Sequence, residues 1–404
     1  MLNNSENTRL TIFIPHPSDL LTNVQPHGDG LVAFEFISRL AERGHSVHVA
    51  TSHFDIQGEL NKNIHLYPMK VDNHLKISGR LSYLIKLRKV FKEVSSKHRI
   101  DVIHQLNPVV PGITLALFPS KEPIFLGPVP AASNEYRGWA YKLLSGEYWP
   151  KQILRSLKKI LVFLQQQQAA AVLVATPAAY NRLLLPRLMS EKIHNLTPGI
   201  DVKKFAALIP SEPYPIYSTD NSPSILFLGK VTDYKGIFVL LDAFERINQK
   251  IPSCQLRIAG GWGKEIEQVK DRICRMSTPS KVSLLGKVER ARIPELMQSS
   301  TVFCFPSFSE PFGMVALEAM ACGKPIVGSN SGGLGYLIHE KGGRKVPPGD
   351  SILLANALLE VLQSAELQQE MGCFNRTLVE TTYDWDQIIN RLEDIYQKTI
   401  ALKS

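Results

Sequence analysis

Long apolar segments are missing from this 404-residue sequence, and no uninterrupted run approaches the roughly 18 residues that a membrane-spanning helix requires. The start is polar and lacks the basic-then-apolar order of a secretory signal, so we expect a cytoplasmic protein. Cysteine is scarce, and its five copies show no paired spacing, so neither a disulfide framework nor a zinc site is indicated. With 44% hydrophobic and 21% charged residues, the composition is that of a globular protein.

Acidic residues are too few in the first half to balance the basic ones. Residues 1–200 hold 23 Lys and Arg against 14 Asp and Glu, whereas residues 201–404 hold 23 of each kind. Much of the excess falls in residues 70–99, whose apolar residues have helix-like spacing, which is typical of a basic amphipathic helix. One interpretation is a solvated helix face, and the other is contact with an anionic acceptor or with an anionic inner-membrane surface. We do not expect a nucleic-acid partner, because no binding motif and no interleaved aromatic residues accompany the charge.

Apolar strand-like runs alternate with helical patterns along the whole chain, which favours an α/β fold built from parallel βαβ units. The length predicts two domains, and a proline-rich stretch between Asn195 and Ser224 marks their connection. We expect Rossmann-like domains over residues 1–200 and 201–385 with a cleft between them, and an amphipathic helix over residues 386–404 that returns to the first domain. The expected strands are 10–14, 47–51, 102–104, 124–127, 172–175, 224–228, 255–259, 282–285, 302–305 and 325–328.

The most informative segment is SEPFGMVALEAMACGKPIVGSNSGG, which begins at Ser309 and follows an apolar strand. It places Glu310 and Glu318 eight residues apart, the first in a strand-to-helix loop and the second within a helix that we expect to end before Gly323. A helix N-terminus at the carboxyl end of a strand binds anions such as phosphate. Carboxylates beside it are suited to accept hydrogen bonds from vicinal hydroxyls. The segment therefore predicts a ligand with phosphate and sugar rings.

This segment resembles the E-x7-E signature of the family 4 glycosyltransferases, and the resemblance covers essentially the whole chain. It implies the GT-B fold, with the second domain holding the nucleotide sugar. By resemblance, Glu310 binds hydroxyls of the donor sugar and Glu318 binds the ribose. Phe312 and the backbone amides of Gly313, Met314 and Val315 would then lie near the sugar and the diphosphate. The competing interpretation is that both carboxylates are ordinary helix and loop acids.

A second cluster, FLGKVTDYKG, begins at Phe227, follows an expected strand and carries Lys230 and Lys235 around the turn at Gly229. Flexible ammonium groups suit a diphosphate leaving group that gains charge as the glycosidic bond breaks. The family usually shows Arg followed by Lys here, so Lys230 replaces a bidentate contact by a point charge. Solvated surface lysines are the alternative.

Two further segments agree with the resemblance. The backbone around Val288, in LGKV, matches the family loop that receives the nucleotide base. Gly28, with His27 before it in HGDG, lies where the family keeps glycines that face the donor phosphates and the acceptor. A glycine turn at residues 259–263, AGGWG, is a weak match, because Gly261 and Trp262 occur where an acidic residue usually follows.

On the acceptor side, His104 ends an expected strand in DVIHQLNP, and Asn107 follows in the same loop. His104 could bond hydroxyls of the donor or acceptor, or it could be a structural histidine bonded into the strand end. A further histidine that the family carries after the next strand is absent from FLGPVP at residues 125–130.

The resemblance implies a retaining hexosyltransferase that uses a UDP-sugar, or alternatively a GDP-sugar, and transfers the sugar to a hydroxyl of a glycan, a lipid-linked or a small-molecule acceptor. The departing diphosphate would take the acceptor proton. We expect neither a cofactor nor a metal, and we interpret Asp384 and Asp386 as residues at a helix start rather than as a metal-binding pair. A dinucleotide-dependent oxidoreductase would need a G-x-G-x-x-G turn, which follows no expected strand. A catalytically silent sugar-nucleotide binder remains the alternative function.

Overall fold

The computed structural model describes residues 9–25, 28–69, 77–106, 120–131, 160, 162–206 and 222–402, with side chains throughout except at residues 77–81. The described chain divides into two compact units. Unit 1 contains the described residues up to Pro130, those from 160 to Gly199, and those from Trp385 onward. Unit 2 contains Ala131 and Ile200–Asp384.

Unit 1 is built on a parallel sheet in the order β5-β3-β1-β6-β7-β8-β9. The direction in which successive strands are added reverses between β1 and β6. A separate pair of two-residue strands, β2 and β4, also pairs in parallel. The strands are β1 (Thr11–Ile14), β2 (Leu21–Thr22), β3 (Ser46–Thr51), β4 (Phe54–Asp55), β5 (Ile64–Pro68), β6 (Val102–Gln105), β7 (Ile124–Val129), β8 (Ala171–Val174) and β9 (Ile193–Asn195). The helices are α1 (Gly28–Glu42), α2 (Ile77–Lys97), α13 (Trp385–Ala401) and two 3-10 segments, Pro177–Arg182 and Pro186–Lys192.

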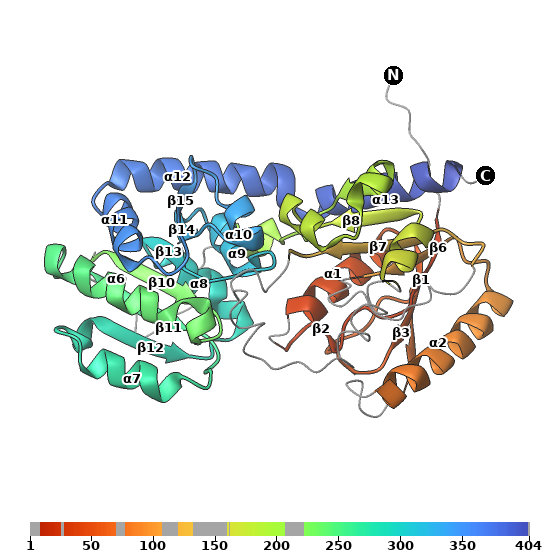
Figure 1. The fold of residues 1–404 in the computed structure, drawn as a ribbon, viewed down its shortest axis with the longest axis horizontal. Helices are drawn as coiled ribbons and strands as arrows, with labels where there is room; N and C mark the ends of the chain where they lie inside the picture. Colours follow the sequence, from red (N-terminus) through yellow and green to blue (C-terminus); the bar gives the residue numbers. More distant parts are fainter. Residues whose placement is uncertain are drawn as a thin grey trace, which may run out of the picture. The chain divides into compact units, whose positions relative to one another are not determined.

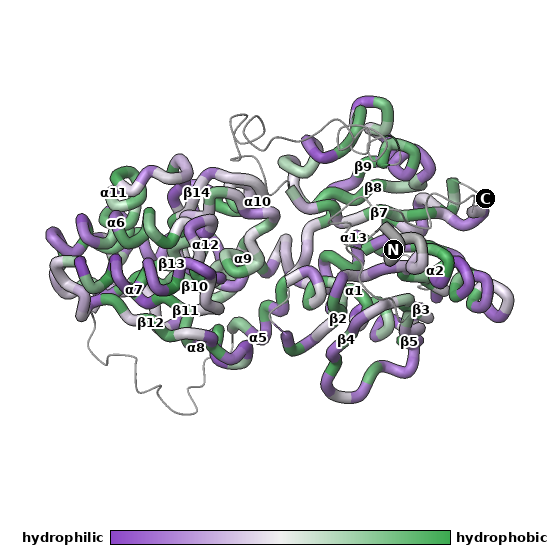
Figure 2. Tube along the Cα trace, turned by 60° about the horizontal axis from the view of Figure 1, so that its bottom comes forward, coloured by the Kyte–Doolittle hydropathy of each residue, from purple (hydrophilic) through white to green (hydrophobic). Residues whose placement is uncertain are grey.

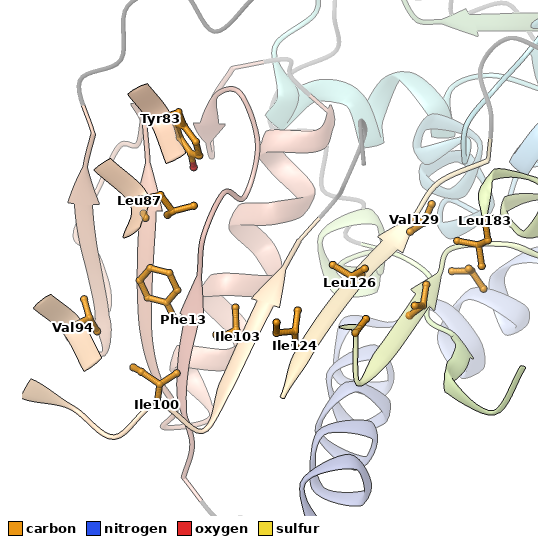
Figure 3. Packing of buried hydrophobic residues seen from close by; sticks show 14 of the residues in the cluster. Phe13, Tyr83, Leu87, Val94, Ile100, Ile103, Ile124, Leu126, Val129 and Leu183 are labelled. Atoms are coloured by element: carbon orange, nitrogen blue, oxygen red, sulfur yellow. The ribbon is translucent and has the colours of Figure 1, made fainter. Parts of the chain in front are cut away.

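Helix α2 covers one face of this sheet. Its Tyr83, Leu87 and Val94 are buried and belong to one apolar cluster with Phe13 of β1 and Ile103 of β6 (Figure 3). Burying such side chains is the dominant stabilising contribution to a domain of this kind. The basic amphipathic helix expected within residues 70–99 is therefore confirmed over its described part.

Helix α13 packs against unit 1 although it is the last element of the chain. His45 lies between two partners: the Leu10 amide donates to Nδ1 at 3.0 Å, and Nε2 donates to the Glu393 carboxylate at 2.8 Å. Arg43 makes a second contact to Glu393 at 3.2 Å. The Trp385 ring packs edge-on against Phe36 of α1, with ring centroids 4.9 Å apart. The terminal helix thus connects residues far apart in sequence within one unit.

Unit 2 repeats the architecture with a parallel sheet in the order β12-β11-β10-β13-β14-β15 (Figure 1). Its strands are β10 (Ser224–Leu228), β11 (Gln255–Ala259), β12 (Val282–Gly286), β13 (Val302–Phe305), β14 (Ile326–Ser329) and β15 (Gly343–Val346). Its helices are α5 (Val202–Ala206), α6 (Ile237–Lys250), α7 (Ile266–Cys274), α8 (Ile293–Gln298), α9 (Met314–Ala321), α10 (Gly332–Leu337), α11 (Ser351–Leu362) and α12 (Ala365–Leu378), with a π-helical turn at Val379–Tyr383 and 3-10 turns at Asp233–Lys235, Pro279–Lys281 and Arg290–Arg292.

The helices of unit 2 form two groups, one on each face of the sheet. Helix α6 contacts α7 and α11, whereas α9 contacts α5, α8, α10 and α12 (Figure 1). Right-handed crossovers that run in opposite directions from the middle of a sheet produce this arrangement. The central strands β10 and β13 are buried along their whole length, and α9 is almost entirely apolar (Figure 2). Glu318 is its only charged residue.

The ten strands expected from the sequence are all present, which confirms the α/β fold class. No helix among the described residues is both long enough and apolar enough to cross a membrane.

Candidate active site

In the parallel sheet of unit 2, the direction in which successive strands are added reverses between β10 and β13, which are neighbours in space but lie far apart in sequence. From β10 the chain proceeds through α6 to β11 on one side, and from β13 it proceeds through α9 to β14 on the other. The loops that leave the carboxyl ends of two such strands diverge, and ligands of open α/β sheets bind at this point. The predicted donor site should therefore involve the loops after β10 and β13.

Two predicted residues meet at this point. Lys235 ends the turn after β10, Glu310 lies in the loop after β13, and the Lys235 Nζ is 2.6 Å from the Glu310 Oε2. The two side chains are partly buried, at 21% and 13% exposure. The Lys235 ammonium also lies over the rings of Phe305 and Tyr234, at 5.4 and 5.6 Å from their centroids. A cation and a carboxylate, 75 residues apart in sequence, thus form one charged pair at the switch point.

Close backbone contact holds this pair together. The Phe308 amide donates to the Tyr234 carbonyl at 3.1 Å, which joins the two loops. Gly236 has a φ of +76°, and a Cβ there would lie 2.0 Å from the carbonyl oxygen of Pro306. Only glycine combines this left-handed backbone with so close an approach. The glycine after Lys235 therefore lets the loop after β10 lie directly against the loop after β13.

A second contact holds the backbone of Glu310. The Gly333 amide donates to the Glu310 carbonyl at 2.8 Å, and a Cβ on Gly332 would lie 2.3 Å from the same oxygen. The paired glycines at the start of α10 thus allow that helix to support the loop of Glu310 from behind.

Helix α9 begins directly after this loop. Gly313 is its N-cap residue, with a φ of +103° and no side-chain cap. The first amides of a helix have no intrahelical acceptors, so those of Met314 and Val315 remain available for an anion. The side chain of Phe312 is buried at 5% exposure, so a donor contact by this residue would come from its backbone.

Glu318 lies one turn further along α9, and its carboxylate is the most unusual group of the site. The side chain is 7% exposed, and no hydrogen bond from the described residues reaches its oxygens. Its nearest cation is Arg290, at 3.9 Å between Nη2 and Oε1. Burial raises the pKa of Glu318, while Arg290 and then Lys204 oppose the shift. Buried polar groups are normally hydrogen-bonded, so this carboxylate is poised to accept hydrogen bonds from a ligand.

The glycine turns after β10, β11 and β12 lie side by side along the same edge. The Gly229 amide donates to the Ala259 carbonyl at 3.0 Å, and the Gly260 amide donates to the Gly286 carbonyl at 2.7 Å. Lys230 follows Gly229, is exposed and forms no ion pair with a described residue. Val288 is half-buried in the loop after β12. All predicted donor-site residues of unit 2 therefore follow the carboxyl ends of its strands.

The surroundings of His104 match the second of its two interpretations, a structural histidine bonded into the strand end. Its ring is completely buried on β6, Nε2 donates to the Gly127 carbonyl at 2.9 Å, and Nδ1 accepts from the Tyr396 hydroxyl. Burial lowers the pKa of His104 to about 4, so the ring is neutral near pH 7. With both nitrogens occupied, His104 has none left for a substrate, and its role is to join β6, β7 and α13.

The remaining predicted residues of unit 1 give less information. Gly28 is the first residue of α1, and a Cβ there would meet no atom within 4 Å. His27 and Asn107 lie outside the described residues. Among the described residues, no group of three or more His, Cys, Asp or Glu is arranged to hold a metal.

Sequence reasoning missed Arg290 and Lys204, the two cations that act on Glu318. Arg290 lies in a run of charged residues after β12, and Lys204 lies in a short helix 114 residues before Glu318. Neither spacing relates the residue to Glu318, so the sequence carried no signal for them.

Two family models match the chain. One is described as glycosyl transferases group 1 and matches residues 215–378, and the other is described as glycosyltransferase family 4 and matches residues 27–204. Together they cover most of both units.

Individual proteins show the same relationship. N-acetyl-alpha-D-glucosaminyl L-malate synthase of Bacillus anthracis is 25% identical over 91% of this chain and 93% of its own length. Phosphatidyl-myo-inositol mannosyltransferase of Mycobacterium tuberculosis is 30% identical, but the match spans only 50% of this chain and 53% of the relative. The solved structure of Anabaena HepE in complex with UDP is similar in fold, with a TM-score of 0.71 at 18% identity, over 96% of this chain and 100% of the other. The two units share the GT-B fold, and the chain belongs to the family 4 glycosyltransferases.

Proposed function

We propose that this chain is a retaining glycosyltransferase that transfers a hexose-type sugar from a nucleotide diphosphate donor to an acceptor hydroxyl. The observation that carries the proposal is the arrangement at the switch point of unit 2, where Lys235 contacts Glu310 and the buried Glu318 carboxylate has unused acceptor capacity. A sugar nucleotide offers what each group needs: sugar hydroxyls for Glu310, negative charge for Lys235 and ribose hydroxyls for Glu318.

The same geometry supports a mechanism by positioning and charge stabilisation. A donor whose diphosphate approaches Lys235 and the first amides of α9 would have its leaving group stabilised as the glycosidic bond breaks. Glu310 would orient the sugar by accepting its hydroxyls. The leaving diphosphate would then accept the proton of the acceptor hydroxyl, on the face where the new bond forms. In this scheme Lys230 is a second, exposed cation for the diphosphate.

A UDP-sugar is the first donor to test, and a GDP-sugar is the second. HepE, which shares the fold, has been solved with UDP and with UDP-glucose. For the acceptor we propose an anionic molecule, such as a phosphorylated or lipid-linked glycan, because the basic excess lies in residues 1–200. Phosphatidyl-myo-inositol, which appears in the name of one relative, is an anionic lipid. Cytoplasmic location and contact with the inner membrane through the basic first half stay predictions.

The test is release of nucleoside diphosphate from a panel of UDP- and GDP-sugars, with and without candidate acceptors. A transferase is expected to release some diphosphate by slow donor hydrolysis even without acceptor. Glu310→Ala should lower turnover by about 100-fold, because a preorganised polar contact is lost. Glu366→Ala, at an exposed position on α12, is the matched control and should be unchanged.

Donor binding without any diphosphate release would favour a catalytically silent sugar-nucleotide binder. Near-normal turnover by a folded Glu310→Ala variant would contradict the role given to Glu310.

A further inference from the structure

The loop after β12, residues 287–290, is the expected base-binding loop. Contacts hold it at both ends, at Gly286 and at Arg290. At the first end, Gly286 adopts a φ of +70°, and its carbonyl accepts the Gly260 amide at 2.7 Å. The side chain of Trp262 packs against the same residue, with Cζ2 3.4 Å from where a Cβ would be. The loop continues through Val288 to the 3-10 turn Arg290–Arg292.

At its second end, the loop reaches helix α9 through one side chain. The Arg290 Nη2 lies 3.9 Å from the Glu318 Oε1, which is close enough for an ion pair but too long for a hydrogen bond. Arg290 is about one-third exposed, whereas the Glu318 side chain is 7% exposed. The guanidinium is thus more exposed than the carboxylate and pairs with it without donating a hydrogen bond to it.

Within the described part of the chain, few other charged or titratable groups surround Glu318. Lys204, on α5, acts on the carboxylate more weakly than Arg290 and is exposed. Cys322, at the end of α9, has its pKa raised to about 12 by burial and by Glu318 and is therefore an uncharged thiol at neutral pH. Lys324 and Arg376 lower the pKa of Cys322, whereas Arg290 and Lys204 are the cations that act on Glu318. Arg290 is therefore the main cation that favours the ionised form of Glu318.

We propose that Arg290 is a positioning residue for the nucleoside: its guanidinium pairs with Glu318, the ribose acceptor, and ties the base-binding loop to helix α9. This inference rests on the proposed function, because it assumes that Glu318 and the loop at Val288 contact the two halves of one nucleoside. A base bound by the loop and a ribose bound by Glu318 would then be held in a fixed mutual orientation through this ion pair. The same argument implies that Arg290 acts on the nucleoside and not on the phosphates.

A neighbouring residue provides a matched control. Arg292 lies on the same 3-10 turn and has a similar exposure of 32%, but its guanidinium contacts Glu295 at 3.1 Å. Arg292→Gln therefore removes the same charge from the same turn without touching Glu318. Arg290→Lys keeps the charge, while Arg290→Gln removes it.

The experiment measures binding of UDP and of uridine by calorimetry between pH 5.5 and 8.5 in these variants and in Glu318→Gln. A ribose bound by the carboxylate is held above the pKa of Glu318 and released as the pH falls through it. Arg290→Gln removes a cation that lowers this pKa, so the loss of affinity should begin at a higher pH. We expect binding by Arg290→Gln to be about tenfold weaker at the lower end of this pH range, with a smaller loss at its upper end and with rescue by Arg290→Lys.

Three results decide the proposal. In the Glu318→Gln background, Arg290→Gln should cause little further loss, because its effect passes through the carboxylate. Uridine and UDP should be weakened by the same factor, and a loss confined to UDP would instead indicate a phosphate contact and overturn the inference. Equal affinities of wild-type and Arg290→Gln proteins at every pH would also overturn it. If the wild-type protein bound neither UDP nor GDP, the proposed function itself would fail.

Discussion

Gly236 shows how strongly a single residue can constrain this site. Its left-handed backbone and its closeness to the Pro306 carbonyl mean that a methyl group must displace one of the two loops that carry Lys235 and Glu310. Gly236→Ala should therefore destabilise the protein by about 3 kcal/mol and lower donor affinity. Chemical denaturation and donor binding measure the two effects.

The control for this substitution lies in a neighbouring turn. A Cβ on Gly261 would meet no atom within 4 Å, and its φ is not in the left-handed region. Gly261→Ala should change stability by no more than about 0.5 kcal/mol. Equal effects of the two alanines would show that steric contact at Gly236 does not govern the loop geometry.

His104 allows a catalytic role to be separated from a structural one. His104→Phe removes partners from the Gly127 carbonyl and the Tyr396 hydroxyl and should cost about 1–3 kcal/mol in stability. Turnover per folded molecule should stay near the wild-type value, because the ring is completely buried and reaches no exposed surface. Tyr396→Phe removes the Nδ1 bond from the other side and should show a smaller loss of the same kind. A large fall in turnover with unchanged stability would restore the substrate-binding role.

At the scale of elements, the way α13 is anchored predicts different stability costs for substituting two neighbouring acidic residues. Glu393 is buried and contacts both His45 and Arg43, whereas Asp394 is half-exposed and contacts only Lys398 on its own helix. Glu393→Ala leaves two partners without a carboxylate and should cost about 3 kcal/mol. Asp394→Ala removes a surface i,i+4 pair and should cost at most about 0.5 kcal/mol. Thermal unfolding of both variants checks the difference, and equal costs would contradict the anchoring role.

The sequence predicted the central elements better than the peripheral ones. Strands such as β10 (SILFL) and β13 (VFCF) are buried on both faces and therefore read as continuous apolar runs. Of the four strands at the edges of the two large sheets, β12 was expected, whereas β5, β9 and β15 escaped prediction. Strand β15 contains Arg344 and Lys345, and β9 is only three residues long. Edge strands need less apolar surface and are often short or charged, so their pattern resembles that of loops.

For the helices and the site, local sequence patterns were also informative for some features and uninformative for others. Helix α9 has the predicted start, and Gly323, at a φ of +67°, ends it as expected. On α2, the apolar Ile85 is 71% exposed while Tyr83 and Leu87 are buried, so the helix-like spacing of apolar residues did not identify every buried position. Local patterns thus located loops, helices and the acids they carry. They gave no information about Arg290, Lys204 or Tyr396, which reach their partners through tertiary packing.

At the scale of the whole molecule, the buried charge of Glu318 should lower the stability of the protein while it supports ligand binding. Burial raises its pKa in the folded state, so the native protein binds a proton more readily there than the unfolded chain does. The ionised carboxylate therefore lowers stability once the pH exceeds its unfolded pKa, and protonation at lower pH relieves the cost.

Glu318→Gln replaces this charge by a neutral amide of similar size. We expect the variant to be more stable than the wild type by about 1 kcal/mol at pH 8, while its affinity for UDP is lower. Denaturation at pH 5 and pH 8 tests the sign, because the advantage should shrink at the lower pH. An advantage that grew toward pH 5, or undiminished UDP affinity, would contradict this account of Glu318.

The position of α13 has a consequence for synthesis on the ribosome. The strands of unit 1 precede those of unit 2 in the chain, yet His45 and His104 find their partners Glu393 and Tyr396 only when α13 has left the exit tunnel. Unit 2 ends before that helix and has all of its described strands available earlier. The later-made half can thus finish folding first, and a premature stop codon a few residues before Trp385 would mainly damage the half that was translated at the beginning.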